Sequence, residues 1–176
     1  MQLKIKLLDG GVLPTKAYVN DAGHDVYSSM KNYVELGPGE RHKFPLGFAI
    51  EIPPGFMGLI QGKSGLAAKK GITTIGNVID SGYRGELHAV LLNTSQKTVI
   101  IEPGTKIAQL IIFPCVTETD IELVSDLSDG ERGDKGFGSS GLYNPSAIKS
   151  PAFMKAQQEL NLIMRNALGV ITDELK

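Results

Sequence analysis

The stretch "FPLGFAIEIPPGFMGLIQG", residues 44–62, decides the fold class. It holds two strand-length apolar runs, residues 44–52 and 56–62, around a turn in which prolines fix φ and a glycine tolerates positive φ. Similar runs recur from residue 1 to about residue 125, among them "QLKIKLL", "ELHAVLLN", "KTVIIEPG" and "KIAQLIIFP". Closely spaced β-type runs without long helices between them predict an all-β sandwich, jelly roll or barrel.

The composition predicts one soluble, cytoplasmic domain. A chain of 176 residues is long enough for one domain with a substantial core, and its net charge of −1 creates no field that favours nucleic acid or an anionic membrane. The N-terminal "MQLKIKLLDGG" lacks the hydrophobic stretch of a signal peptide, and no apolar run is long enough to cross a membrane. The single cysteine, Cys115, excludes an internal disulfide and lies in an apolar run, which favours a buried structural thiol.

The chain divides into three predicted parts: a β core over residues 1–125, a glycine-rich flexible arm over residues 126–141, and a linker with an amphipathic helix over residues 142–176. Ser150 is the expected N-cap of the helix, with Pro151 at the first helical position. Apolar residues recur at helical spacing and form a stripe that must dock on its own domain, on another copy or on a protein partner: Phe153, Ala156, Leu160, Ile163, Ala167 and Val170.

The segment "GLIQGKSG" resembles a phosphate-binding P-loop but fails its spacing. Met57 stands where the first glycine belongs, and the α/β context of that motif is missing. Lys63, Ser64 and Gly65 still place a cation, a hydroxyl and accessible N–H groups at one turn, and such turns can bind anions. Triplets of this kind are also common in ordinary turns.

Two aspartates are candidates for chemistry. Asp80 lies in "GNVIDSGYRGELHAVLLN", residues 76–93, which we interpret as a β-hairpin; it follows apolar residues, where partial desolvation would suit a base towards water. The alternative is a turn-forming aspartate. Asp25 lies in "DAGHDVYSS" and could hold a hydrated divalent cation, or belong to a plain polar loop.

The glycine-rich stretch "ERGDKGFGSSG", residues 131–141, combines one aromatic ring, two adjacent hydroxyls and an arginine. Its glycines favour neither helix nor strand. A ligand with both a planar ring and phosphates would use these groups, and an ordinary flexible tail would also have this composition.

Five segments in order carry a family resemblance. "AGHDVYSS", "GKSGLAAKKGI", "GNVIDSGYRGEL", "GTKIAQLII" and "RGDKGFGSSG", from about residue 22 to residue 141, resemble the successive motifs of the homotrimeric deoxyuridine triphosphatases (dUTPases). The resemblance implies a distorted jelly-roll β-barrel, to which this chain adds a C-terminal α-helix. It also implies a homotrimer whose active sites combine motifs of all three chains, with the arm of a third chain closing each site.

The resemblance also implies residue roles. Asp80 matches the carboxylate that activates the attacking water, and Tyr83 matches the ring that packs against deoxyribose. The uracil edge is read by backbone groups of Asn77, Val78, Ile79 and Asp80. The phosphates are bound by Lys63, Ser64, Gly65 and Gln109. The arm contributes Phe137, which stacks on uracil, together with Arg132, Gly138, Ser139 and Ser140, which close over the γ-phosphate end. Asp25 matches the carboxylate that holds Mg²⁺ through water, and Lys63 stands where the family usually has arginine.

The implied reaction is Mg²⁺-assisted, in-line attack of water on the α-phosphorus of dUTP, which yields dUMP and pyrophosphate. Such an activity limits uracil incorporation into DNA and supplies dUMP for dTMP synthesis. Two alternatives remain at this point. A dCTP deaminase shares the fold but lacks the closing arm, and a regulatory binding protein would use the C-terminal helix as its partner-facing element.

Overall fold

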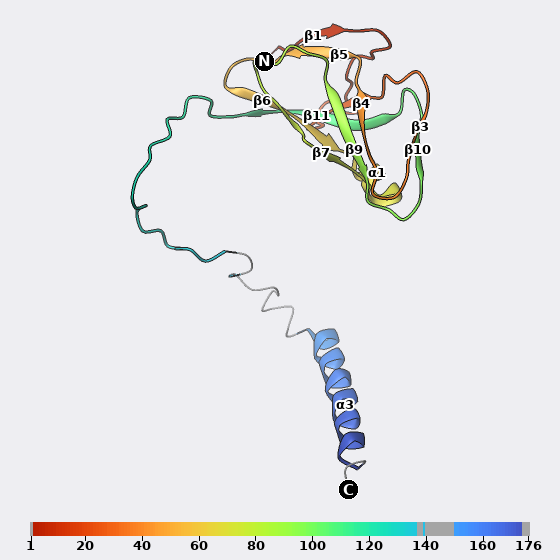
Figure 1. Ribbon diagram of the computed structural model, residues 1–176, viewed down its shortest axis with the longest axis vertical. Coiled ribbons are helices and arrows are strands. Elements are labelled where there is room, and N and C mark those ends of the chain that lie inside the picture. The colour runs from red at the N-terminus through yellow and green to blue at the C-terminus, as the bar shows by residue number, and fades with distance from the viewer. Residues whose placement is uncertain (1, 137–138, 140–149, 174–176) are drawn as a thin grey trace. The chain divides into compact units, whose positions relative to one another are not determined.

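Antiparallel strands account for the regular structure of residues 1–121, apart from one short helix (Figure 1). The computed structural model describes residues 2–136, 139 and 150–173. The strands form four small sheets, with the orders β1 (Lys4–Leu7)–β5 (Phe48–Glu51), β3 (Val34–Leu36)–β10 (Val99–Ile101), β4 (Arg41–Pro45)–β9 (His88–Asn93)–β7 (Ile72–Ile75), and β2 (His24–Tyr27)–β11 (Lys106–Pro114)–β6 (Phe56–Gly62)–β8 (Val78–Ile79). The all-β prediction is confirmed for this unit.

One hydrophobic core draws side chains from all four sheets. Phe44 and Phe48, both within residues 44–62, are fully buried. Strand β9 alternates strictly between half-buried and buried residues, as expected for a strand with one face on the core. Each large apolar side chain buried in this way contributes about 1.5–3 kcal/mol to stability, so the core holds the strands that carry the site residues.

A close approach of two chain segments depends on glycine. The N–H of Leu8 donates to the carbonyl of Gly47 at 2.8 Å, and a Cβ atom on Gly47 would lie 2.9 Å from the Cβ of Ser29 and overlap Gly11. Gly47 also has φ of +71°, in the left-handed region that favours glycine. The turn between β4 and β5 therefore requires glycine for space and for conformation.

The predicted hairpin over residues 76–93 is wrong in its pairing. Strand β8 pairs with β6, in the register Gly58↔Ile79 and Leu59↔Val78, whereas β9 pairs with β4 and β7. On one side, β9 therefore pairs with β7, the strand before Gly76, instead of with β8. Strand β7 matches β9 over four residues, whereas β8 is only two residues long. This arrangement leaves β8 as an edge strand of the four-stranded sheet.

The predicted turn at Lys63–Gly65 is the start of a short helix, α1 (Ser64–Lys70). Its sequence, "SGLAAKK", is rich in good helix formers, and Gly71 ends it in the left-handed conformation with φ of +67°. Cys115 differs from its prediction too: it is half-buried rather than buried, because it follows the end of β11.

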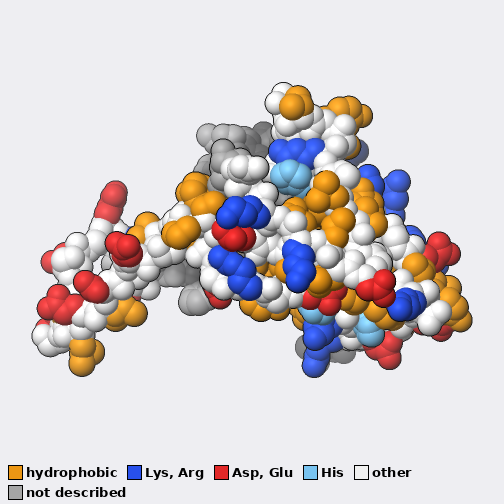
Figure 2. Space-filling model, turned by 90° about the horizontal axis from the view of Figure 1, so that it is seen from above, with side chains coloured by type: hydrophobic (Ala, Val, Ile, Leu, Met, Phe, Trp, Pro, Cys, Tyr) orange, Lys and Arg blue, Asp and Glu red, His pale blue; other side chains and the backbone are white. Residues whose placement is uncertain are grey.

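The second unit, residues 122–176, contains the helix α3 (Pro151–Asp173). Ser150 is its N-cap as predicted, since the N–H of Phe153 donates to the Ser150 hydroxyl at 3.2 Å. Leu160 and Ile163 of the predicted stripe are 51% and 63% exposed, and the side chains of Ala167 and Val170 lie outside the described residues. No helix among the described residues has both the length and the apolar character needed to span a membrane. In Figure 2, basic and acidic side chains both occur over the centre and right of the view, with hydrophobic side chains between them, whereas the charged side chains at the left are acidic.

Candidate functional site

Three neighbouring strands align polar residues on one face of the largest sheet. Gln109 of β11 is directly opposite Asp25 of β2 and Gln61 of β6. Directly opposed residues of antiparallel strands point to the same face. Lys63 has an extended backbone, with φ of −91° and ψ of 129°, so the alternation of β6 continues to it and places its side chain on that face as well.

Asp25 is the centre of a charge cluster. Its Oδ1 atom is paired with the ammonium of Lys63, and its Oδ2 atom lies 2.9 Å from the ammonium of Lys106. Only 12% of the Asp25 side chain is exposed, against 29% for Lys63 and 47% for Lys106. Burial alone raises the pKa of Asp25, but the hydrogen bonds and charges of the two lysines outweigh it and lower that pKa below the ordinary aspartate value. The carboxylate is therefore held ionised.

A cavity of about 280 Å³ opens beside this cluster and collects four predicted site residues. Asp25, Lys63, Ser64 and Gln109 line it, together with Asp21. Gln109 is held in place because its Nε2 atom donates to the carbonyl of Gly62 at 3.2 Å. Gly65 does not line this cavity, but with Ser64 it forms the first turn of α1, where backbone N–H groups have no partner within the helix. We call this the Lys63 cavity.

The described residues do not fit a metal ion held by Asp25. Both of its oxygens carry an ammonium partner, so an added cation would meet two positive charges. Within residues 2–136, 139 and 150–173, no group of three or more His, Cys, Asp or Glu side chains could hold a metal ion. The predicted role of Asp25 in holding Mg²⁺ is thus not met by the arrangement of this carboxylate and its two lysines.

A second cavity, of about 200 Å³, collects four more residues of the predicted site, whereas Asn77 does not line it. Val78, Ile79, Asp80 and Tyr83 line it, and we call it the Asp80 cavity. The Tyr83 hydroxyl donates to the carbonyl of Glu86 at 3.0 Å, and its phenol ring lies over Gly85, where a Cβ atom would be only 2.7 Å from the ring carbon Cζ. The position of the Tyr83 ring therefore depends on a glycine two residues later.

The expected partial desolvation of Asp80 is wrong for the single chain. Asp80 is exposed, because β8 ends at Ile79 on the edge of the sheet and Asp80 opens a turn in which the Tyr83 N–H donates to its carbonyl at 3.1 Å. Asn77, just before β8, has its side-chain oxygen buried with no hydrogen-bond partner among the described residues, and its backbone carbonyl accepts from the Ile60 N–H. The edge of β8 and this amide are thus polar groups without strand partners among the described residues.

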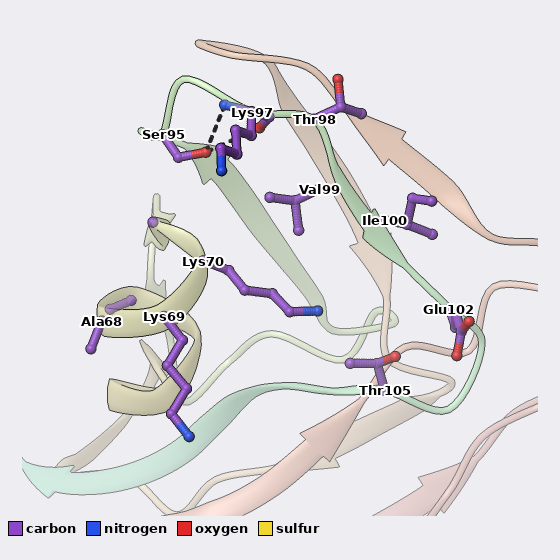
Figure 3. Close-up of a pocket in the computed structure, with 12 residues that line it drawn as sticks. Ala68, Lys69, Lys70, Ser95, Lys97, Thr98, Val99, Ile100, Glu102 and Thr105 are labelled. Carbon is purple, nitrogen blue, oxygen red and sulfur yellow. Dashed lines mark hydrogen bonds between the residues drawn. The ribbon is translucent and has the colours of Figure 1, made fainter.

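Among the described residues none lines both cavities: Asp25, Lys63, Ser64 and Gln109 line one, and Val78, Ile79, Asp80 and Tyr83 line the other. A larger cavity, of about 730 Å³, lies elsewhere, between the end of α1 and strand β10, and none of the predicted site residues lines it. In Figure 3, Lys70 extends from α1 toward Val99 and Thr105 on the other side of that cavity. Its size alone gives it no connection to the predicted chemistry.

Comparisons with known proteins decide the family. The sequence model of the dUTPase family matches residues 10–141. The deoxyuridine 5'-triphosphate nucleotidohydrolase of Caldanaerobacter subterraneus subsp. tengcongensis is 41% identical over 145 residues, covering 80% of this chain and 97% of that protein. The chain belongs to the dUTPase family.

Other dUTPases support the same assignment. The deoxyuridine 5'-triphosphate nucleotidohydrolase of Mycolicibacterium gilvum is 44% identical and covers 73% of this chain and 87% of its own length. Among solved structures, the dUTPase of Staphylococcus bacteriophage 80alpha with dUpNHpp has a TM-score of 0.72 at 30% identity, covering 80% of this chain and 99% of its own. The phage phi11 dUTPase, with a structural Mg(II) ion, has a TM-score of 0.66 at 26% identity, covering 73% of this chain and all of its own. The predicted dUTPase jelly roll is confirmed.

The residues of the predicted arm belong to the second unit. Arg132 is exposed, and its Nε atom donates to the carbonyl of Lys135 at 2.8 Å. Ser139 is exposed, and its N–H donates to the carbonyl of Gly136 at 3.1 Å. Phe137, Gly138 and Ser140 lie outside the described residues.

Sequence reasoning missed two residues that shape the candidate site. Lys106 pairs with Asp25, 81 positions earlier, and no local spacing connects them; only the pairing of β11 with β2 brings them together. The backbone carbonyl of Glu86 accepts a hydrogen bond from the Tyr83 hydroxyl, and its side-chain carboxylate accepts one from the Gly47 N–H, both at 3.0 Å. The one sequence signal for this contact was the position of Glu86 three residues after Tyr83, since a backbone carbonyl so close in a turn commonly accepts a hydrogen bond from a side chain.

Proposed function

We propose that this protein hydrolyses dUTP to dUMP and pyrophosphate at active sites shared between the chains of a homotrimer. The observation that carries the proposal is the separation of the site residues into the Lys63 cavity and the Asp80 cavity on one chain. Each cavity holds only half of the groups that the reaction needs: phosphate-binding groups in one, and the base and sugar-packing ring in the other. Association of chains would complete each half with the other half of a neighbour.

Uracil recognition is assigned to the edge strand β8. Its outer edge offers the backbone N–H and C=O groups of Val78 and the N–H of Asp80, because Ile79 faces β6 and the Asp80 carbonyl accepts from the Tyr83 N–H. Asn77 adds a buried amide oxygen that lacks a partner among the described residues. A paired donor and acceptor match uracil, whereas cytosine presents the reversed pattern and would leave buried polar groups unpaired. Tyr83 packs against deoxyribose and leaves no room for a ribose 2′-hydroxyl.

Asp80 is assigned the role of general base. Its carboxylate accepts a proton from a water molecule while the water oxygen forms a bond to the α-phosphorus, and the bond from that phosphorus to the oxygen bridging to the β-phosphorus breaks. The proton passes to Asp80 and pyrophosphate leaves with the bridging oxygen. Because Asp80 is exposed on the single chain, the desolvation that would favour its basicity must come from a neighbouring chain.

The Lys63 cavity is assigned to the triphosphate. Lys63 supplies a point charge, Gln109 and Ser64 supply polar side chains at the cavity wall, and the N–H groups of Ser64 and Gly65 belong to the first turn of α1. Magnesium is proposed as the cofactor that enters with the triphosphate. Since Asp25 does not fit a metal ion while both lysines are bound to it, no step of the reaction is assigned to a metal on Asp25.

Residues 126–141 are proposed to close the occupied site. Phe137 would stack on the uracil ring while Arg132, Gly138, Ser139 and Ser140 cover the γ-phosphate end. A stacked base contributes about 1–3 kcal/mol, enough to hold a short segment closed while product still leaves. Removal of residues 131–176 should leave the folding of residues 1–121 intact and abolish most turnover, because that unit contains the hydrophobic core by itself.

The cellular role follows from the reaction: removal of dUTP limits uracil incorporation into DNA, and dUMP is supplied for dTMP synthesis.

A separate proposal concerns residues 150–176. Leu160, Leu162 and Ile163 of α3 are more than half exposed, which supports docking on another copy or on a protein partner. Comparison of the mass in solution with and without residues 150–176 separates self-association from a role in binding a different protein.

The experiment that tests the proposal is a pyrophosphate-release assay with dUTP, UTP, dTTP and dCTP in the presence of Mg²⁺. Selective cleavage of dUTP is expected, because the β8 edge and Tyr83 exclude the other bases and ribose. Ammonia release from dCTP would instead support the deaminase alternative, and the absence of pyrophosphate with dUTP would contradict the proposed activity.

A further inference from the structure

The two lysines on Asp25 hold different positions relative to the Lys63 cavity. Lys63 and Asp25 both line it, whereas Lys106 pairs with the other carboxylate oxygen and does not line it. Lys106 is instead placed 5.8 Å from the centre of the Tyr27 ring, beside the strand that carries Asp25. An incoming polyphosphate would thus meet one of the two ammonium groups and not the other.

Lys63 is therefore already engaged before a ligand arrives. Asp25 is 12% exposed, and Asp21 adds a second carboxylate to the cavity wall. A polyphosphate that entered with Lys63 still on Asp25 would face two carboxylates at short range, and Lys63, the one lysine among the described residues that line the cavity, would be shared with Asp25. Phosphate binding at this cavity requires a change of partners.

We propose that Lys63 is an exchangeable counter-ion: in the ligand-free protein it neutralises Asp25, and on binding it transfers its ammonium from Asp25 to the polyphosphate, while Lys106 stays on Asp25 as its permanent partner. This inference rests on the proposed function of the Lys63 cavity. It assigns Lys106 as a positioning residue, which keeps the carboxylate paired when Lys63 leaves.

The geometry favours movement of the lysine over movement of the aspartate. The Asp25 backbone is fixed on both sides, since it pairs with Gln109 of β11 and exchanges two backbone hydrogen bonds with Thr15, at 2.6 and 3.2 Å. Lys63 is at the end of β6 on a flexible four-carbon stem, and its side chain is more exposed than that of Asp25. Loss of one ammonium also leaves Asp25 with a partner, which avoids an unpaired buried charge.

The same exchange accounts for the misfit of a metal ion at Asp25. While Lys63 and Lys106 are both bound, the carboxylate is surrounded by positive charge and offers no free site. Once Lys63 has moved to the phosphates, one carboxylate oxygen is open towards the cavity.

The test is calorimetric binding of the non-hydrolysable analogue dUpNHpp, with EDTA and then with Mg²⁺. In EDTA, Asp25→Asn should bind the analogue about 10-fold more tightly than the wild type, because Lys63 is released before the ligand arrives. Asp21→Asn is the matched control: it removes a carboxylate from the same cavity that is bonded to the Tyr18 N–H and not to a lysine, so it reports charge removal alone. Lys106→Gln should not tighten binding, since Lys63 stays on Asp25.

Equal affinities of Asp25→Asn and Asp21→Asn in EDTA, or weaker binding by Asp25→Asn, would overturn the exchange. If the wild type cleaves dUTP and binds dUpNHpp, but Asp25→Asn and Asp21→Asn bind the analogue equally tightly, only the exchange fails. If the wild type binds no dUpNHpp under either condition, the proposed function fails, and the exchange fails with it. Circular dichroism of each variant verifies that the fold is unchanged.

Discussion

Replacement of Gly85 by alanine should weaken the choice between dUTP and UTP without unfolding the protein. A Cβ atom at residue 85 would lie 2.7 Å from the Cζ atom of Tyr83, whereas ordinary contact begins at 3.4 Å, so the ring must move by at least 3.4 − 2.7 = 0.7 Å. The hydrogen bond from its hydroxyl to the Glu86 carbonyl, now 3.0 Å, must lengthen or break. Tyr83 is proposed to pack against deoxyribose, and its displacement opens space for a 2′-hydroxyl.

The size of the effect follows from this shift. A misplacement of about 1 Å at a positioning group can cost roughly 10²-fold in rate, and loss of one hydrogen bond costs about 1 kcal/mol. We expect the ratio of kcat/KM for dUTP to that for UTP to fall by about 10-fold, which corresponds to about 1.4 kcal/mol. The free energy of unfolding should fall by no more than about 1 kcal/mol, the cost of one hydrogen bond, because the far end of an exposed side chain can move.

Gly82→Ala is the matched control for this prediction. It adds the same methyl group to the same loop, but a Cβ atom at residue 82 has no neighbour within 4 Å. Pyrophosphate release from dUTP and UTP, measured for both variants, should show a changed ratio in Gly85→Ala alone. An unchanged ratio in Gly85→Ala, or an equal change in Gly82→Ala, would refute the assignment of Tyr83 to the sugar.

Three further predictions concern the base, the fold and acid stability. Asp80→Asn should lower kcat by at least ~10²-fold while dUpNHpp binding persists, and near-normal turnover would contradict its role. Gly47→Ala should cost about 3 kcal/mol in urea unfolding, from overlap plus left-handed strain, whereas Gly39→Ala, with φ of +75° and open space, should cost about 1 kcal/mol. The lowered pKa of Asp25 stabilises the fold above the ordinary carboxyl range, and this stability is lost as the pH falls through the folded-state pKa, so the stability gap between the wild type and Asp25→Asn should narrow from about pH 7 to about pH 3 in unfolding curves.

The sequence was most informative where one local pattern settles the structure. Alternation and proline–glycine turns predict the strands, and Ser150 with Pro151 predicts the start of α3. The pairing of strands was harder to predict from the sequence. Strands β8 and β9 are neighbours in sequence, yet β8 pairs with β6 and β9 pairs with β7, because strand partners depend on the whole sheet rather than on the intervening turn. The short helix α1 was missed for a related reason, since seven residues with two glycines at or beside the ends give little helical periodicity.

For the site, the order of the motifs predicted which residues gather but not how they pair. Asp25, Lys63 and Gln109 do meet at one cavity, yet the role of Asp25 as a metal holder could not anticipate Lys106, which reaches it through the register of β11 and β2. The exposure of Asp80 was also beyond local reasoning, because the apolar residues before it belong to an edge strand. Desolvation of such a group depends on surfaces that a single chain does not contain.

Mixed assemblies test the sharing of sites between chains. Asp80→Asn damages the Asp80 cavity and Lys63→Gln damages the Lys63 cavity, so each variant alone should hydrolyse dUTP poorly. When the two are expressed together, about a quarter of the sites in randomly mixed symmetric trimers combine an intact Asp80 with an intact Lys63 from different chains. We predict that the mixed sample releases pyrophosphate well above the mean of the two separate variants; activity no higher than that mean would show that each site lies within one chain.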